Sequence, residues 1–366
     1  MVRVMQEKSI NDMHNEFHRI YHSKIKSLME EFEKKRIVEL LKFVLVALAA
    51  IIIIYVCFKQ CQVNFSESAM LIGLSAPVVA AYFLYNIQNN FSKELKKRCL
   101  PKIVKAFGNM KWFNGKQELD SDDIFKSELF SEFNRREDDD AFVGVYKDVD
   151  FTISETVLWY VSSGRNKIVY KVFNGVIVNF SSNKNIKNKT IIATKNDIHI
   201  KGRQWGIWLA VLMMLPALSP MIVGGYTLED VWYVGSLVFI TLTCLLILFF
   251  SNRGKEKLNE IKLEDAEFNK HYKAFSSDEV EGRYLITTSF MERFKNLQTA
   301  FGAQKAKCSF YDSDIMFAIS TRRNLFEIGN IFTPLTNPKH LTRFYNELSS
   351  ILTLIDYFKL DEKTGL

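Results

Sequence analysis

The sequence lacks the residue patterns that the common enzymatic mechanisms require. It contains no glycine-rich phosphate loop, no Gly-x-Ser-x-Gly elbow and no His-Glu-x-x-His pair, so kinase, serine hydrolase and zinc protease chemistry have no recognisable basis. Its five cysteines include no Cys-x-x-Cys pair and no conventional zinc spacing, which is typical of reduced thiols in the cytosol. We therefore predict a protein that is not an enzyme and that has no cofactor.

Charged residues are also absent where ion-coupled transport needs them. Inside the long apolar runs the only ionisable side chains, apart from thiols and tyrosines, are Glu39 and Lys42, near one end of the first run. Pumps and ion-coupled transporters place charged groups at mid-depth in the membrane. A small transporter or oligomeric channel is therefore the alternative prediction, and an enzyme acting on lipid or envelope precursors is the third.

Long apolar runs are what the sequence does contain. Residues 37–58, 69–87, 205–226 and 231–250 form four such runs, each about long enough to cross a bilayer as a helix. The first two are separated by residues 59–68 and the last two by residues 227–230. Connections this short predict two transmembrane hairpins, over residues 37–87 and 205–250.

Basic residues gather at one end of each run. The net charge is +7, yet residues 59–68 contain only Lys59 as a basic residue and residues 227–230 contain Glu229 and Asp230 instead. Because basic segments resist translocation, both termini and the long polar segments are predicted to be cytoplasmic. This charge favours anionic membrane lipids, and not nucleic acid, as a partner.

The polar sequence predicts a cytoplasmic α+β domain. Residues 1–36 carry apolar side chains at helical spacing and predict an amphipathic helix. We expect it to pack on its own domain, and pairing with its copy in another subunit is the alternative. Alternation from about residue 141 to residue 193 predicts an antiparallel β-meander, with turns at residues 147–148 and 174–175. The meander alone and the region after residue 250 are each too small to bury much core, so we expect residues 88–204 and 251–366 to fold together around the second hairpin.

Residues 251–366 add helices to this domain. Helices are predicted over residues 258–269, 278–284 and 289–301, followed by a strand pair joined at residues 312–314 and a final helix opened by Asn337 and Pro338. The predicted fold class is therefore an α-helical membrane protein with four transmembrane helices in two hairpins, plus a cytoplasmic α+β domain containing an antiparallel β-meander.

Five short phrases of the polar sequence resemble a known family. They are residues 168–176 (IVYKVFNGV), 185–190 (NIKNKT), 263–268 (LEDAEF), 276–287 (SSDEVEGRYLIT) and 290–293 (FMER). In them the chain resembles a bacterial family of multi-pass membrane proteins known only as a domain of unknown function. The resemblance implies an N-terminal transmembrane hairpin followed by one cytoplasmic α+β domain, and it offers no catalytic residue. The present chain departs from this pattern by the apolar residues 205–250.

Histidines and acidic residues supply the candidate sites. His14, His18 and His22 recur every fourth residue, a spacing at which a helix can chelate a metal, but no further ligand is evident and a solvated face is favoured. Residues 137–140 form an acidic run that we interpret as a solvated turn before the first strand.

Asp278, Glu279, Glu281 and Arg283 form a candidate interaction surface in the most family-like phrase. Ser277 followed by two acids is equally typical of a helix N-terminus, and capping is the favoured interpretation. The leading functional hypothesis is a membrane-tethered binding or scaffold module of the bacterial inner membrane. Its expected partners are membrane lipids and either another protein or a second copy of the chain.

Overall fold

The structure, a computed structural model, describes residues 10–63, 67–164, 167–182, 186–195, 197, 258–303 and 305–358. The predicted spans over residues 205–226 and 231–250 lie outside the described residues.

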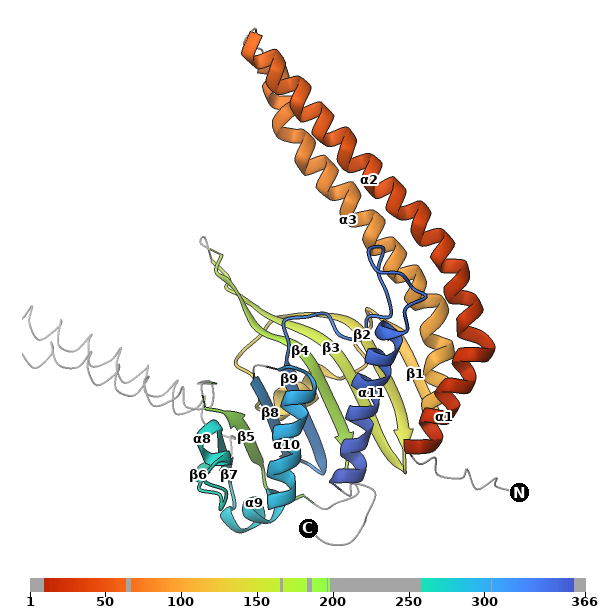
Figure 1. The fold of residues 1–366 in the computed structure, drawn as a ribbon. Helices are drawn as coiled ribbons and strands as arrows, with labels where there is room; N and C mark the ends of the chain where they lie inside the picture. The colour runs from red at the N-terminus through yellow and green to blue at the C-terminus, as the bar shows by residue number, and fades with distance from the viewer. Residues whose placement is uncertain are drawn as a thin grey trace, which may run out of the picture.

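A long helical hairpin runs away from the folded domain (Figure 1). Helix α1 (Ile10–Ile20), the π-helical turn η1 (Tyr21–Ile25) and α2 (Lys26–Val63) are continuous, and α3 (Glu67–Ile103) returns beside α2 and ends in the 3-10 turn η2 (Val104–Phe107). Both helices are long enough and apolar enough to cross a membrane, and in each only 6% of the most apolar window is buried. They are therefore unlike the core helices of a soluble domain.

The foot of this hairpin is part of the domain core. Met13 and Phe17 of α1 and Phe91 and Leu95 of α3 are buried in the same apolar cluster as the sheet. Phe17 also contacts Tyr345, with ring centroids 4.8 Å apart. The amphipathic N-terminal helix thus packs on its own domain, as its apolar stripe predicts.

One antiparallel sheet contains all the described strands. In sheet order these are β1 (Asn109–Asn114), β2 (Arg135–Tyr146), β3 (Val149–Val161), β4 (Val169–Ser181), β9 (Asp314–Ser320), β8 (Lys305–Tyr311), β5 (Thr190–Thr194), β7 (Tyr272–Ser276) and β6 (Asn259–Ile261). Strands β9 and β8 lie between β4 and β5. Strands that precede residues 198–257 and strands that follow them therefore pair in one sheet.

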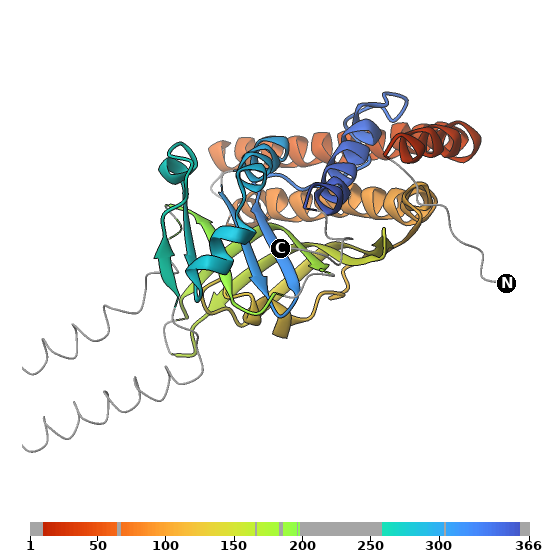
Figure 2. The ribbon, with the colours of Figure 1, turned by 90° about the horizontal axis from the view of Figure 1, so that it is seen from below.

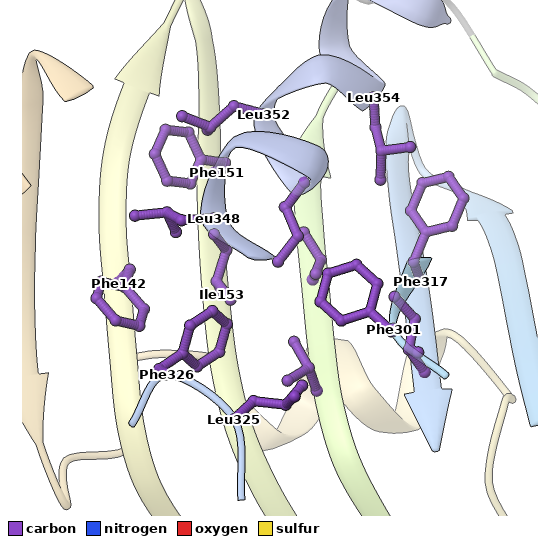
Figure 3. Close-up of a cluster of buried hydrophobic side chains, with 14 of the residues drawn as sticks. Phe142, Phe151, Ile153, Phe301, Phe317, Leu325, Phe326, Leu348, Leu352 and Leu354 are labelled. Atoms are coloured by element: carbon purple, nitrogen blue, oxygen red, sulfur yellow. The ribbon is translucent and has the colours of Figure 1, made fainter. Parts of the chain in front are cut away.

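Helices cover both faces of the sheet. Helices α10 (Thr288–Ala300) and α11 (Lys339–Tyr357) lie on the same face as the hairpin foot (Figure 2). Leu348 and Leu352 of α11 meet Phe142, Phe151 and Ile153 of β2 and β3 there (Figure 3). The short helix α4 (Ser121–Lys126) contributes Ile124 to a smaller cluster that also contains Ile177 of β4.

Two predicted hairpin turns are confirmed. Lys147 and Asp148 have φ of 49° and 57°, and Asp312 and Ser313 have φ of 45° and 66°. Two consecutive residues with positive φ form the turn whose twist matches that of the paired strands.

The predicted turn at residues 174–175 is wrong. Both residues lie inside β4, where Gly175 has φ of 156° and a Cβ atom on it would lie 2.0 Å from the Ile319 carbonyl oxygen of β9. Here the glycine permits close strand approach instead of chain reversal.

The predicted helix over residues 258–269 is also wrong for most of its length. The chain forms the edge strand β6 first, which pairs with β7, and only α8 (Phe268–His271) is helical. Pairing with a neighbouring strand overrides the helical spacing of the apolar residues. The later helices agree with prediction: α9 (Glu279–Leu285), α10 and α11.

The acidic run is not a turn, because residues 137–140 lie within β2. Side chains two residues apart share one face of a strand. Arg136 accordingly pairs with Asp138 at 2.6 Å on the buried face, while Arg135 pairs with Glu137 at 2.5 Å on the exposed face. Same-face pairing is what allows so charged a sequence to enter a sheet.

Candidate functional site

A β-bulge in β2 brings three carboxylates together. The pairing of β2 with β3 shifts between Asp138 and Ala141, so that Asp139 and Asp140 lie opposite the single residue Glu155. A bulge of this kind re-aims side chains that regular alternation sends to opposite faces. One carboxylate oxygen from each of Asp139, Asp140 and Glu155 lies within 4.8 Å of the other two, so these residues could hold a metal ion.

A lysine from the hairpin foot enters the same group. The Lys96 ammonium of α3 lies 2.7 Å from Asp140 Oδ2, 2.8 Å from Glu327 Oε1 and 3.7 Å from Asp139 Oδ2. The side chains of Lys96 and Asp140 are only 5% and 0% exposed. We call Lys96, Asp139, Asp140, Glu155 and Glu327 the acidic cluster.

Hydrogen bonds hold all four carboxylates. The Asn324 side-chain amide donates to Asp139 Oδ2 at 3.2 Å and to Glu327 Oε1 at 2.8 Å. Trp112 Nε1 of β1 donates to Asp140 Oδ1 at 2.8 Å, and the Leu325 backbone N–H donates to Glu155 Oε1 at 2.8 Å. Glu155 Oε2 has no hydrogen-bond partner among the described residues, although Glu155 is only 8% exposed. A buried acceptor without a partner is uncommon in native proteins.

Burial dominates the electrostatics of the cluster. It raises the pKa of Asp140 to about 6, against the opposing charge of Lys96. It raises the pKa of Glu155 to about 9, and the hydrogen bond from Leu325 offsets only part of that rise. Burial disfavours the charged form of Lys96, but the nearby carboxylates outweigh it and raise the pKa of Lys96. Lys96 is therefore the fixed cation of the group.

A second set of contacts ties α2 to residues 321–338. Arg36 Nη1 donates to the Ile331 carbonyl oxygen at 2.9 Å and Nη2 donates to Glu33 at 2.7 Å. Glu33 Oε2 accepts a 2.9 Å hydrogen bond from the Leu335 backbone N–H. We call Glu33, Arg36 and residues 321–338, with the acidic cluster, the hairpin junction.

The three histidines lie on the exposed side of the N-terminal helix. His14 Nε2 and His18 Nε2 are 3.1 Å apart, and the His18 and His22 rings stack with centroids 6.4 Å apart. The His14 ring also packs edge-on against Tyr345. The helical spacing therefore does bring the histidines side by side, remote in sequence from the acidic cluster.

The residues of the candidate interaction surface divide into two pairs. Asp278 caps α9 by accepting from the Glu281 backbone N–H at 2.9 Å. Glu281 accepts from the Lys187 backbone N–H at 2.9 Å and from the Asn188 side chain, so both acids hold local structure. Glu279 and Arg283 instead form an exposed ion pair of 2.8 Å.

Helix α9 presents apolar side chains beside that ion pair. Val280 and Tyr284 are 79% and 49% exposed, and their spacing places them on one helix face. The opposite side packs through Gly282, where an added Cβ would lie 2.7 Å from Ile261 Cδ1. A cleft of about 160 Å³ adjoins the helix, lined by Leu263, Glu264, Arg283, Ile286, Thr287, Thr288 and Met291.

Sequence reasoning missed the acidic cluster. Lys96 belongs to the basic residues that predict the orientation of the hairpin, and the acidic residues 137–140 predict a solvated turn. The available signal is Glu155, an acid in the middle of the alternating strand sequence of residues 149–161, whose other acid, Asp150, lies at the strand end. Nothing in the sequence indicates that a bulge places it opposite two aspartates.

Comparison with known proteins gives a family without a known activity. A family model described as "Protein of unknown function (DUF3137)" matches residues 171–360. No curated protein and no solved structure matches the chain.

Proposed function

We propose that this chain, which belongs to the DUF3137 family of proteins of unknown function, is a membrane-anchored binding module. In this proposal two transmembrane hairpins hold one α+β domain at the cytoplasmic face of a bacterial inner membrane. The domain contacts lipid headgroups and binds a protein partner there.

The single observation that carries the proposal is the change in surface along the first hairpin. Arg36 and Glu33 are engaged with residues 321–338, whereas Ile37 and Leu41 immediately after them are 56% and 59% exposed. An exposed apolar stretch of this length is favourable in lipid and costly in water. The hairpin therefore suits a membrane from about residue 37 onward.

Orientation and the second hairpin extend the proposal. Lys34, Lys35 and Arg36 precede the first span and Lys93, Lys96, Lys97 and Arg98 follow the second, which favours a cytoplasmic domain. Residues 205–226 and 231–250 are apolar enough to form the second hairpin. Both termini are then cytoplasmic.

The contacts of the hairpin junction favour a domain that is held rigidly on the membrane hairpin over one that is attached by a flexible linker. Lys96 of α3 and Arg36 of α2 both bond to residues 321–338 as well as to their local carboxylates. Phe43 and Phe332 are in edge-to-face contact, with centroids 5.1 Å apart. Since Phe43 lies within the proposed span, Phe332 reaches the level of the membrane surface.

The exposed face of α9 is the proposed binding surface. It combines the apolar Val280 and Tyr284 with the Glu279–Arg283 ion pair, a mixture of aromatic, apolar and Arg groups that protein interfaces favour. Asp278 and Glu281 contribute by holding the helix in place.

Cysteine labelling tests the orientation. With the other four cysteines replaced by alanine, Cys61, near the end of α2, should react with a membrane-impermeant maleimide in intact spheroplasts. The matched control is Val280→Cys in a cysteine-free chain, which should react only after lysis. Labelling in the reverse pattern contradicts the proposed topology.

Site-specific photo-crosslinking tests binding. A photoreactive residue at Val280 or Tyr284 should give a discrete crosslinked product in living cells. Phe125, which is 50% exposed on α4, is the control position and should give none. Equal products at both positions, or ion flux through reconstituted vesicles, would contradict the binding module, and flux would favour a transporter.

A further inference from the structure

The acidic cluster carries more negative charge than its described residues neutralise. Three carboxylates, those of Asp139, Asp140 and Glu327, lie within 3.7 Å of the Lys96 ammonium, and the Glu155 carboxylate lies within 4.8 Å of the two aspartates. Lys96 is closest to Asp140 and Glu327. Uncompensated charge in the interior is costly, so such a group requires a further cation or a bound proton.

The geometry of Glu155 leaves room for a cation. Its Oε2 atom has no hydrogen-bond partner among the described residues, and oxygens of Asp139 and Asp140 lie within 4.8 Å of its carboxylate. A buried acceptor without a partner is uncommon and invites a ligand. A metal ion shared by three carboxylates needs only that their oxygens surround one point, and the separations of up to 4.8 Å between them permit this.

We propose that Asp139, Asp140 and Glu155 bind a hard divalent cation of the Ca²⁺ type. Ca²⁺ takes oxygen ligands at roughly 2.3–2.6 Å, so two ligand oxygens on one ion lie no more than about 5 Å apart. The Asp139 side chain is 45% exposed, and it leaves an open side through which an ion enters and water completes the coordination.

The bound ion has a structural consequence at the hairpin junction. Asp139 and Asp140 belong to β2, Glu155 belongs to β3, and Lys96 of α3 and Leu325 bond to two of these carboxylates. One cation therefore stabilises the connection between the sheet, the hairpin and residues 321–338. This inference does not depend on the proposed binding function.

Terbium luminescence provides a direct test, because an indole ring that can sensitise the emission is hydrogen-bonded to the acidic cluster. Tb³⁺ resembles Ca²⁺ in its preference for oxygen ligands, and indole excitation sensitises Tb³⁺ emission only at short range. Trp112 Nε1 is 2.8 Å from Asp140 Oδ1. Titration of the full chain in a neutral detergent should give saturable emission that Ca²⁺ competes away, and Trp112→Phe should lose most of that emission.

Two ligand variants and one control variant make the test specific. Glu155→Gln keeps an oxygen for the Leu325 N–H and removes the charge, so the chain should fold and bind Tb³⁺ at least about tenfold more weakly. Asp139→Asn should do the same. Asp312→Asn alters an exposed turn acid and should leave binding unchanged.

Two results would overturn the proposal. One is Tb³⁺ emission that fails to saturate or that Ca²⁺ does not displace. The other is emission of equal affinity in wild type and Glu155→Gln, with Ca²⁺ producing no rise in the thermal unfolding midpoint of the wild-type chain. Either result assigns the cluster to proton binding instead.

Discussion

The guanidinium of Arg36 donates a 2.9 Å hydrogen bond to the carbonyl oxygen of Ile331, a residue 295 positions away in the sequence. Arg36 directly precedes the exposed apolar stretch of α2, and Ile331 lies in the segment between β9 and α11. This contact lies close to the point where the hairpin leaves the domain, and Phe43, which contacts Phe332, is one of the last residues of α2 to touch the domain.

Removing the Arg36 side chain should weaken the junction. Arg36→Met loses the bond to Ile331 and leaves Glu33 without its cation, and hydrogen bonds of charged groups contribute about 2 kcal/mol. Urea unfolding in detergent, followed by circular dichroism, should show a loss of that size. Arg98→Met is the control, because Arg98 and Glu31 are 51% and 65% exposed and such pairs contribute at most about 1 kcal/mol. Equal losses of unfolding free energy in the two variants would contradict a role for Arg36 in holding the hairpin junction.

Lys96 should be among the most sensitive positions in the domain. Lys96→Met leaves the fully buried Asp140 carboxylate without its counter-ion, a change that typically costs about 3–5 kcal/mol. Adding Asp140→Asn should recover part of the loss, because the buried charge is then gone. Lys35→Met provides the comparison, since its pair with Glu94 is about 40% exposed on both sides and should contribute little. A double-mutant cycle with no coupling would refute a buried pair.

Lowering the pH should destabilise the hairpin junction, because Glu33 then becomes protonated. The hydrogen bond from Arg36 lowers the pKa of Glu33 from 4.5, and burial only partly opposes it. A carboxyl group with a lowered folded-state pKa stabilises the fold above its unfolded value, and that stability is lost as pH falls through the folded value. The free energy of unfolding should therefore fall below about pH 4.5, and Glu33→Gln should show a smaller fall. An identical pH profile for the variant would exclude this role.

Gly175 should tolerate no side chain. In Gly175→Ala the new Cβ would lie 2.0 Å from the Ile319 carbonyl oxygen, so β4 and β9 must separate locally. Overpacking of this kind costs about 3 kcal/mol. Gly164→Ala is the control, because no atom lies within 4 Å of its added Cβ, and its effect should stay within about 0.5 kcal/mol. Similar unfolding midpoints for the two variants would argue against the close strand approach.

The sequence predicts the parts of this fold that rest on local rules. The length and hydropathy of residues 37–58 and 69–87 predict the described helical hairpin. Asp312 predicts a turn, because aspartate tolerates positive φ. Pro338 likewise marks the start of α11.

Contacts between distant segments are what the sequence leaves undetermined. Gly175 alone predicts a turn, and only its close approach to β9 shows why a glycine is needed within a strand. Residues 137–140 alone predict a solvated segment, but Lys96 and Arg136 form ion pairs with two of them in the folded domain. The candidate metal ligands depend on a bulge, which is a property of the pairing between two strands. No single strand sequence contains that information.

The position of β8 and β9 between β4 and β5 imposes an order on biosynthesis. When the nascent chain has emerged from the ribosome only as far as residue 194, β4 has no neighbour on the side that β9 later fills. An open strand edge invites pairing with other chains. Residues 198–257 are translated during this interval, so any membrane insertion of their apolar runs begins before the sheet closes. The unfinished edge of β4, together with β5, whose neighbours β7 and β8 are both translated later, is therefore open to wrong pairing until translation is complete.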